Sequence, residues 1–263
     1  LGYALAPVAS FALGALFGWR GALVAMGAIG LVALGLLATQ RTFLTSQRAT
    51  DAAAAAGGGG ASAGSPYAAG WRLFVQAPIL MCFAFFMLQT MGTTGVQTFA
   101  GNALNAGFGL PLAITNSAVT AYLLGSTAGI LAGGFLAARL GRHDLVAASG
   151  LAAGATLMVV VGAGGVTAAT VLPLFAATGF AIGSTGPSRD FIVRHATPKG
   201  ASGRVYGFVY SGLDTGGVFG PVIFGWMLDR AHPREIFLVM AALFVAAIVT
   251  VVNVRRVQSA GAN

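Results

Sequence analysis

The chain has very little charge. Only 8% of its 263 residues are Asp, Glu, Lys or Arg, whereas 57% are hydrophobic, and an ordinary soluble domain carries about 25% charged residues. So few charges cannot cover the surface of a water-soluble globule, which argues against a soluble enzyme, a secreted scaffold and a disordered tail. The one cysteine, Cys82, cannot form an internal disulfide. This composition predicts a polytopic membrane protein.

The motifs of soluble catalysis and of nucleic-acid binding are missing as well. The sequence contains no phosphate-binding loop, no HExxH motif and no Cys-x-x-Cys pair, and its three histidines are scattered. The net charge of +8 comes from basic residues that lie between apolar runs, whereas a nucleic-acid binder gathers them on one face. We therefore expect no enzymatic activity, no metal, no cofactor and no nucleic-acid partner.

The uncharged intervals predict the membrane spans, which fall within residues 21–40, 73–138, 145–188, 205–228 (interrupted only by an aspartate) and 236–254. One helix needs about 20 residues to cross the hydrocarbon core, so the second and third intervals each hold two helices. We expect turns at 101–111 and 162–167, where Gly, Asn and Pro or Thr gather. Such long apolar runs favour helices over barrel strands, so the expected fold class is an all-α membrane helix bundle.

The basic residues predict the topology. Eleven of the fourteen basic residues fall in alternate connections between the spans. The exceptions are Arg20, Arg230 and Arg234. Connections rich in Lys and Arg stay in the cytoplasm. We therefore expect a multi-pass protein of the inner (cytoplasmic) membrane, with its linker and its C-terminus in the cytoplasm.

An internal repeat indicates a duplicated unit. A shift of 214 residues aligns Gly2 with Gly216, Pro7 with Pro221, Val8 with Val222, Arg20 with Arg234, Met26 with Met240, and Arg41 with Arg255. Apolar runs and loop charges coincide at the same shift. Chance agreement between two biased sequences is the alternative explanation.

The repeat predicts how the chain divides into domains. Residues 1–41 match the last two helices of a six-helix unit, so we expect them to be the end of a truncated N-terminal half. Residues 42–72, rich in Ala, Gly and Ser, form a flexible cytoplasmic linker. Residues 73–256 form a C-terminal six-helix half, and 257–263 a cytoplasmic tail. About eight transmembrane helices, from the end of helix 5 through helix 12, would be present, and residues 1–263 alone would not transport.

This plan resembles the major facilitator superfamily of secondary transporters. Gly134-Phe-Leu-Ala-Ala-Arg139-Leu-Gly141-Arg142 is similar to the family's cytoplasmic glycine and arginine loop, although Ala138 stands where that loop has Asp. Gly18-Trp19-Arg20 is similar to the family's extracytoplasmic turn before the sixth helix. The resemblance implies a helix bundle that moves a small solute by alternating access.

Two further motifs are similar to those of particular members. Gly216, Gly220 and Pro221 resemble the Gly-Pro signature of proton antiporters, here on the equivalent helix of the second half. Residues 186–190 (Gly-Pro-Ser-Arg-Asp) and 211–214 (Ser-Gly-Leu-Asp) resemble bacterial drug-efflux members of the fosmidomycin-resistance type. These likenesses imply proton coupling and efflux.

Asp214 is the first candidate for the proton and substrate pathway. It lies about 15 Å beyond Arg204 along a helix, near the bilayer midplane, where a lone carboxylate costs at least about 2.5 kcal/mol. We expect it to bind the coupling proton or a cationic group of the solute. The alternative is a structural acid that is hydrogen-bonded to Tyr210 or to a neighbouring helix.

Other polar residues at helical spacing extend the candidate pathway. Residues four apart share a helix face, and we expect such stripes either to line a solute cavity or to hydrogen-bond between helices. They are Tyr206 and Tyr210 with Asp214, then Gln89, Thr93 and Gln97, and the shorter pair Asn116 and Thr120.

Two further sets of residues are expected to serve packing and gating. Gly125, Gly129 and Gly133 recur every fourth residue, which lets another helix approach closely, and Gly216, Gly220 and Pro221 belong to the same packing set. We expect a cytoplasmic gate or loop to be formed by Gly134, Arg139, Gly141, Arg142, Arg189 and Asp190.

Together these features predict a monomeric secondary transporter, embedded in the lipid bilayer, that moves a small molecule with protons or another coupling ion. The alternatives are a nutrient uniporter or symporter, and a non-transporting membrane sensor or scaffold with the same fold.

Overall fold

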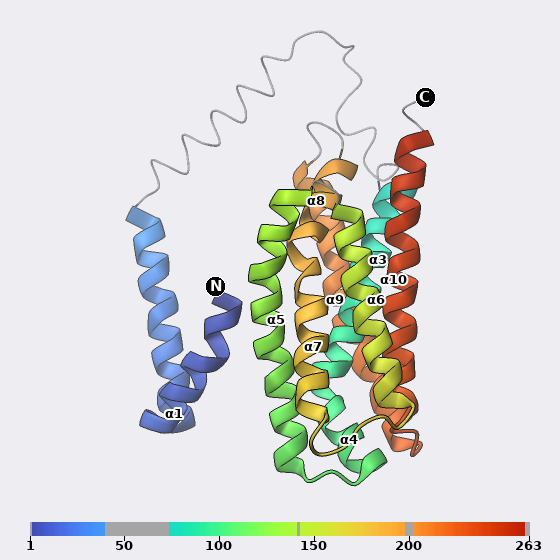
Figure 1. Cartoon of the computed structure of the whole chain (residues 1–263). Helices are drawn as coiled ribbons and strands as arrows, with labels where there is room; N and C mark the ends of the chain where they lie inside the picture. Colours follow the sequence, from blue (N-terminus) through green and yellow to red (C-terminus); the bar gives the residue numbers. More distant parts are fainter. Residues whose placement is uncertain (1, 40–73, 141–142, 198–201, 261–263) are drawn as a thin grey trace. The chain divides into compact units, whose positions relative to one another are not determined.

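The computed structural model describes residues 2–39, 74–140, 143–197 and 202–260. The chain divides into two compact units, 1–68 and 69–263, which are considered one at a time (Figure 1). The described residues are helical almost throughout and include no strand. This confirms the predicted all-α class. The whole of the predicted linker, 42–72, lies outside the described residues.

The first unit contains α1 (Gly2–Thr39), which consists of two helical segments that meet at Gly18. Gly18 has φ 69° and ψ 172°, a backbone conformation that glycine adopts without a steric penalty. The stretch Leu16–Thr39, which includes the second segment, is long and apolar enough to cross a membrane. The break at Gly18 coincides with the turn expected at Gly18-Trp19-Arg20.

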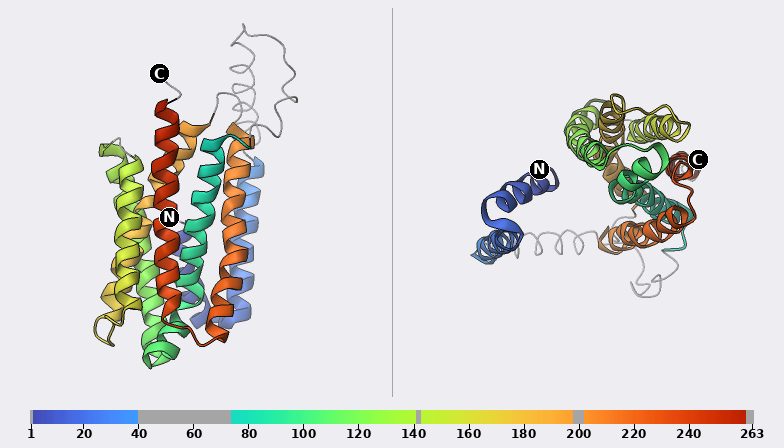
Figure 2. Two further views of the ribbon diagram at one scale, coloured as in Figure 1. Left: turned by 90° about the vertical axis from the view of Figure 1, so that its right-hand side faces the viewer. Right: turned by 90° about the horizontal axis from the view of Figure 1, so that it is seen from below.

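The second unit contains α3 (Ala77–Thr98), α4 (Ala100–Phe108), α5 (Leu112–Leu140), α6 (His143–Gly162), α7 (Val171–Gly183), α8 (Thr185–Ala196), α9 (Ser202–Asp229) and α10 (Glu235–Ala260). Only Ser184 separates α7 from α8, so these two helices form one path through the unit. The long helices stand side by side (Figures 1 and 2). Four of them, α3, α5, α6 and α10, include stretches that are long and apolar enough to span a membrane.

The expected turn at 101–111 is instead mostly a short helix, α4. Its residues Ala100, Ala103 and Leu104 are spaced three and four apart and are all buried, so a helix lets one face of the segment pack. Gly109, with φ 67°, ends α4 in the left-handed conformation. The second expected turn is confirmed, because α6 ends at Gly162.

The helix pairings within this unit follow a regular pattern. Helix α5 packs along α7, and α3 packs along α9. Helix α10 lies against both α3 and α6, and α6 also contacts α7 and α8 (Figure 2). Helix α3 corresponds to α7–α8, α5 to α9, and α6 to α10, because the partners of each helix correspond to the partners of its counterpart. For example, α5 packs on α7 as α9 packs on α3. Two similar three-helix groups therefore make up the unit.

Glycines set the closest helix approaches. A Cβ atom added at Gly125, Gly129 or Gly133 of α5 would meet a backbone carbonyl oxygen, those of Ala176, Phe180 and Ser184 respectively. In α9 the same holds for Gly212 and Gly216, which lie against the carbonyl oxygens of Phe83 and Met87 in α3. Gly220 continues this second seam one turn further, against Met91. Small residues at these seams let the backbones of paired helices touch.

The unit is apolar both inside and outside. Phe86, Phe175, Phe224, Phe237 and Phe244 are fully buried and belong to one core cluster. Large apolar side chains also cover the exterior, including Leu124, Leu131 and Phe135 of α5 and Val218, Val222 and Trp226 of α9. A surface this apolar suits a lipid environment rather than water.

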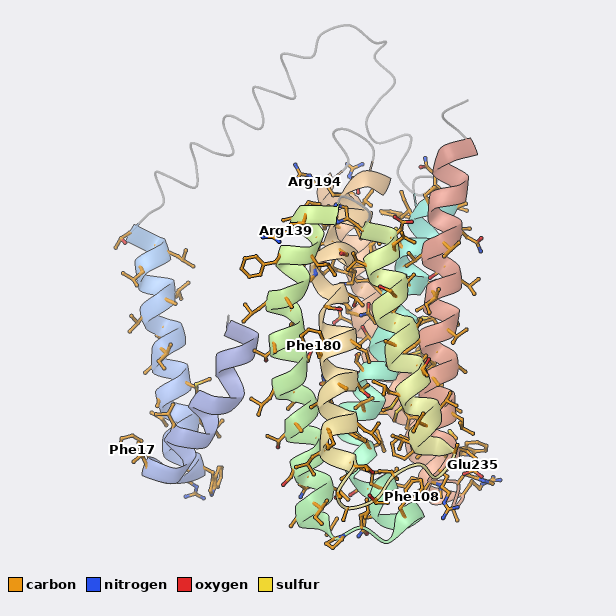
Figure 3. The ribbon with its side chains drawn as sticks, viewed as in Figure 1. Phe17, Phe108, Arg139, Phe180, Arg194 and Glu235 are labelled. Carbon is orange, nitrogen blue, oxygen red and sulfur yellow. The ribbon has the colours of Figure 1, made fainter. Side chains whose placement is uncertain are left out.

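The two ends of the unit differ in charge. Arg139 and Arg194 lie at one end, and Phe108 and Glu235 lie at the opposite end (Figure 3). At the second end, Arg234 Nε donates a hydrogen bond to the Gly107 carbonyl oxygen over 2.9 Å. Its guanidinium lies 4.9 Å from the centre of the Phe108 ring. Arg234 thus ties α4 to the turn that precedes α10.

Candidate functional site

Polar side chains from three helices lie beside the buried ring of Phe86, which Arg189 and Tyr210 contact, or are linked to those residues through hydrogen bonds and the chain. We call this set the polar cluster, and its members are Gln89 of α3, Thr185, Ser188, Arg189 and Asp190 of α8, and Tyr210 of α9. Gln89, Thr185 and Ser188 are buried. Thr185, Ser188 and Arg189 are spaced three and four apart, so they share one face of α8.

A hydrogen bond joins α3 to α8 on that face. Gln89 Nε2 donates to Thr185 Oγ1 over 3.0 Å, and Thr185 Oγ1 donates in turn to the Ile182 carbonyl oxygen over 2.7 Å. The other amide atom, Gln89 Oε1, is buried and has no hydrogen-bond partner among the described residues. Buried polar atoms usually have a partner, so this oxygen is an unused acceptor within the described part of the unit.

Arg189 lies one helical turn from Thr185 and contacts the ring of Phe86. Its Cζ atom is 4.7 Å from the ring centre, within the range of a cation–π interaction. The Nε atom lies 3.6 Å from Asp190 Oδ1, which is an ion-pair distance but too long for a hydrogen bond. The guanidinium is therefore only loosely paired.

Tyr210 links α8 to α9. Its hydroxyl donates to Asp190 Oδ1 over 3.0 Å, and its ring lies 5.2 Å from that of Phe86, centre to centre. The Tyr206 ring lies 5.9 Å from the Tyr210 ring. The two tyrosines of the predicted stripe thus come together, and Tyr210 reaches into the polar cluster.

Asp214 lies outside the polar cluster. It follows Tyr210 by one turn of α9 and is exposed, on the same helix face as Val218 and Val222. Within the described part of the chain, its carboxylate makes no hydrogen bond or ion pair. The Tyr210 hydroxyl, considered above as a partner for Asp214, bonds to Asp190 instead.

The stripe on α3 divides between the interior and the surface. Gln89 is buried against α8, Thr93 Oγ1 donates to the Thr90 carbonyl oxygen of its own helix over 3.1 Å, and Gln97 is exposed. On α5, Asn116 is exposed, and Thr120 Oγ1 donates to its carbonyl oxygen over 3.1 Å. Of these residues only Gln89 joins the polar cluster.

The residues expected at the cytoplasmic gate lie in two places. Gly134 and Arg139 are exposed near the end of α5, whereas Gly141 and Arg142 lie outside the described residues. Arg189 and Asp190 lie about 10 Å before the end of α8, at roughly 1.5 Å per residue, and they belong to the polar cluster.

A family comparison decides which class of protein carries this cluster. The model of the Major Facilitator Superfamily matches residues 87–262. The chain belongs to the major facilitator superfamily. The match includes every residue of the polar cluster. No curated protein and no solved structure matches the chain.

Membership in the superfamily settles the broad function. The chain is a multi-pass membrane protein and a transporter. Members of the superfamily are transporters rather than enzymes, and they bind small-molecule substrates within a lipid bilayer.

Two residues of this superfamily member's polar cluster, Thr185 and Ser188, were not predicted as site residues from the sequence. Their spacing with Arg189, in a chain that is otherwise apolar, is the signal that could have identified them. Among the described residues, no group of three His, Cys, Asp or Glu side chains could hold a metal ion.

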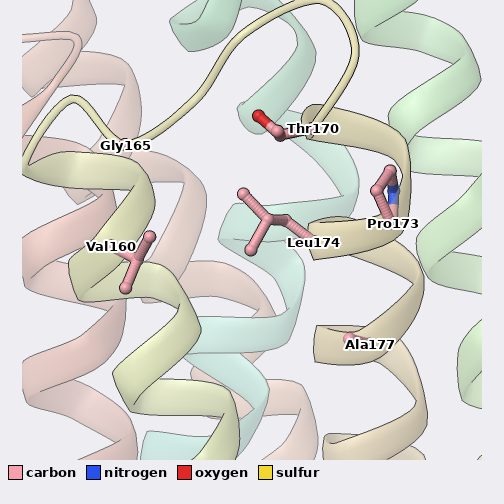
Figure 4. Close-up of a pocket in the computed structure, with 6 residues that line it drawn as sticks. All are labelled: Val160, Gly165, Thr170, Pro173, Leu174 and Ala177. Carbon is pink, nitrogen blue, oxygen red and sulfur yellow. The ribbon is translucent and has the colours of Figure 1, made fainter.

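A surface hollow of about 360 Å³ lies away from the polar cluster (Figure 4). Its lining residues are Val160, Gly165, Thr170, Pro173, Leu174 and Ala177. Thr170 carries the only side-chain hydroxyl of this lining, and that hydroxyl lies within hydrogen-bond distance of Thr167. The hollow therefore offers little with which to recognise a polar solute.

Proposed function

We propose that this transporter moves a small solute by alternating access and draws its energy from a proton gradient. The observation that carries the proposal is the position of Asp214. Its carboxylate stands about midway along α9, on an exposed helix face that is otherwise largely apolar. A charged carboxylate at the bilayer midplane costs at least about 2.5 kcal/mol, and binding a proton removes that charge.

Asp214 is one helical turn from Tyr210, which belongs to the polar cluster. A proton carrier and a polar solute site on adjacent turns can influence each other directly, as coupling requires. Tyr206, Gln89, Thr93, Gln97 and Asn116 are proposed to contribute to the same pathway.

The glycine seams support motion of helix pairs as rigid groups. Gly125, Gly129 and Gly133 join α5 to α7, and Gly216 and Gly220 join α9 to α3. Pro221 follows within α9. Closely packed helices can rock together while the solute site opens to one side and then to the other.

The proposal includes an orientation and a division of the chain. Residues 73–256 form the C-terminal six-helix half, 1–41 contribute to an N-terminal half, and the linker 42–72 and the tail 257–263 lie in the cytoplasm of a monomer in the inner membrane. The basic end of the second unit, where Arg139 and Arg194 lie, is then cytoplasmic, and the proposed gate loop of Gly134, Arg139, Gly141 and Arg142 belongs to that side. Arg189 and Asp190 form a gate beneath it. The likeness of 186–190 and 211–214 to drug-efflux members favours export.

The test uses the full-length protein in vesicles with an imposed pH gradient. Ethidium represents exported drugs, and labelled sugars, amino acids and organic acids represent nutrients. We expect movement of at least one of these solutes to cease when a proton ionophore collapses the gradient. The Asp214→Asn variant should lose gradient-driven movement, whereas Asp229→Asn, an exposed carboxylate at the end of α9, should retain it.

The other outcomes identify the alternatives. Movement that persists with the ionophore present would indicate a uniporter. Undiminished proton-coupled movement in Asp214→Asn would remove Asp214 from the mechanism. A correctly inserted protein that moves none of the solutes would indicate a sensor or scaffold.

A further inference from the structure

We propose that the polar cluster binds an anionic group, and hence that the solute is a small organic anion such as a carboxylate or a phosphonate. The guanidinium of Arg189 and the hydroxyl of Ser188 are its two donors. This inference deepens the proposed function and rests on it for the step from binding to transport.

Arg189 has unused hydrogen-bonding capacity. A guanidinium carries five N–H donors, yet among the described residues this one makes no hydrogen bond. Its Nε atom is buried, and one face of the group is occupied by the ring of Phe86. The planar N–H fork remains, and that fork matches the two oxygens of a carboxylate or the oxygens of a phosphonate.

Ser188 directly precedes Arg189 in the chain and adds a second hydrogen-bond donor. Its side chain is fully buried, and its Oγ atom has no hydrogen-bond partner in the described structure. Most buried hydroxyls bond to their own helix, as Thr185 and Ser184 do here. A buried hydroxyl without that bond is unusual, and its donor is unused.

Asp190 is a weak competitor for Arg189. Its carboxylate stays 3.6 Å from Arg189 Nε and accepts the hydrogen bond of Tyr210 from α9. Its side chain is 51% exposed and that of Arg189 is 24% exposed. The guanidinium can therefore be reached from its exposed side, while Asp190 is held toward Tyr210.

The experiment measures thermal unfolding of the purified chain through Cys82. This cysteine is the only one in the sequence and is 2% exposed in α3, so a thiol-reactive dye reports when the bundle opens. Benzoate, benzamide and benzylamine share one ring but carry a negative, no and a positive charge, respectively, at neutral pH. Phenylphosphonate is a second anion, and sodium chloride controls for ionic strength.

We expect benzoate or phenylphosphonate to raise the unfolding temperature in a saturable manner, and benzamide and benzylamine to have no effect. The Arg189→Gln variant should bind the anion at least about tenfold more weakly, because a hydrogen bond to a charged group is lost. Arg194→Gln, which removes an exposed arginine of the same helix, should bind as the wild type does. Ser188→Ala should weaken binding several-fold, and it keeps the proposal testable if Arg189→Gln fails to fold.

Asp190→Asn gives a result that a purely structural role would not produce. Removal of the competing carboxylate should strengthen anion binding, even if the variant is less stable. The proposal is overturned if neither anion stabilises the wild type beyond chloride, if benzylamine stabilises it instead, or if Arg189→Gln or Ser188→Ala binds the anion as the wild type does. A full-length protein that transports only cations or neutral solutes overturns this inference and leaves the proposed function intact, whereas absence of all transport overturns the proposed function alone.

Discussion

Gln89 and Thr185 share a buried hydrogen bond of 3.0 Å that joins α3 to α8. The bond connects the two three-helix groups of the second unit. Such bonds between membrane helices contribute about 0.6 kcal/mol on average and at most about 1.7 kcal/mol. Their contribution is modest because the unfolded chain in the membrane also finds partners.

A double-mutant cycle should measure this coupling. We expect Gln89→Met and Thr185→Val each to lower the free energy of unfolding in detergent, and their effects to be non-additive by about 0.5–1.5 kcal/mol. Gln89→Met with Thr93→Val is the control cycle, because Thr93 bonds within its own helix. Additive effects in both cycles would mean that the Gln89–Thr185 bond contributes no measurable stability.

The seam between α5 and α7 should not tolerate a methyl group. At Gly129 an added Cβ would meet the Phe180 backbone, whereas at Gly134, on the same helix, it would meet nothing within 4 Å. We expect Gly129→Ala to destabilise the unit by about 1–3 kcal/mol, the cost of overpacking. Gly134→Ala should stabilise it by up to about 1 kcal/mol, because alanine favours the helix. Equal unfolding temperatures for the two variants would contradict the close approach.

Removal of one hydroxyl should separate the roles of the two tyrosines. Tyr210→Phe deletes the hydrogen bond to Asp190 and should lower stability by about 1 kcal/mol. This is less than the roughly 1.5–3 kcal/mol usual for a bond to a charged group, because Asp190 is half exposed. Tyr206→Phe keeps the ring and loses no hydrogen bond within the described structure, so it should be nearly neutral. Thermal unfolding of both variants provides the comparison. A larger loss in Tyr206→Phe would reverse the assignment.

The fold could largely be predicted from the sequence because lipid restricts the choices. Uncharged intervals must be helical, and the ends of α6 and α9 fall close to where charge and glycine predict them. The helix α4 could not be predicted in this way, because its apolar face is buried only once α5 and α3 lie beside it.

The candidate site was predicted only in part. Helical spacing correctly brings Tyr206 and Tyr210 together, but spacing within one helix does not reveal which helix lies opposite. The sequence therefore indicates Asp214 as a partner of Tyr210. In the structure, α8 packs against α3 and α9, and the Tyr210 hydroxyl bonds to Asp190 instead. In the structure Ser188 is distinguished by its buried oxygen, which makes no bond to its own helix.

The contact between Arg234 and α4 should depend on the geometry of the guanidinium as well as on its charge. Arg234→Lys keeps the charge but loses the Nε donor that bonds to the Gly107 carbonyl oxygen. We expect it to lower the free energy of unfolding by about 0.5–1.5 kcal/mol and to speed amide exchange in α4. Arg230→Lys is the matched control, because Arg230 only contacts the ring of Trp226. Unchanged exchange in α4 would show that Arg234 does not hold this helix.

Cysteine labelling should place the two ends of the second unit on opposite sides of the membrane. In a Cys82→Ala background, single cysteines at Ala168 and His232, exposed at the Phe108 and Glu235 end, should react with a membrane-impermeant maleimide in intact cells. Cysteines at Ala138 and Gly203 should react only after permeabilisation, because their end carries arginines and the proposed orientation therefore places it in the cytoplasm. All four residues are exposed, so failure to react reflects the membrane rather than burial. If Ala138 and Gly203 were labelled from opposite sides, an odd number of crossings would separate them. The α6–α7–α8 hairpin, and with it the six-helix half, would then be wrong.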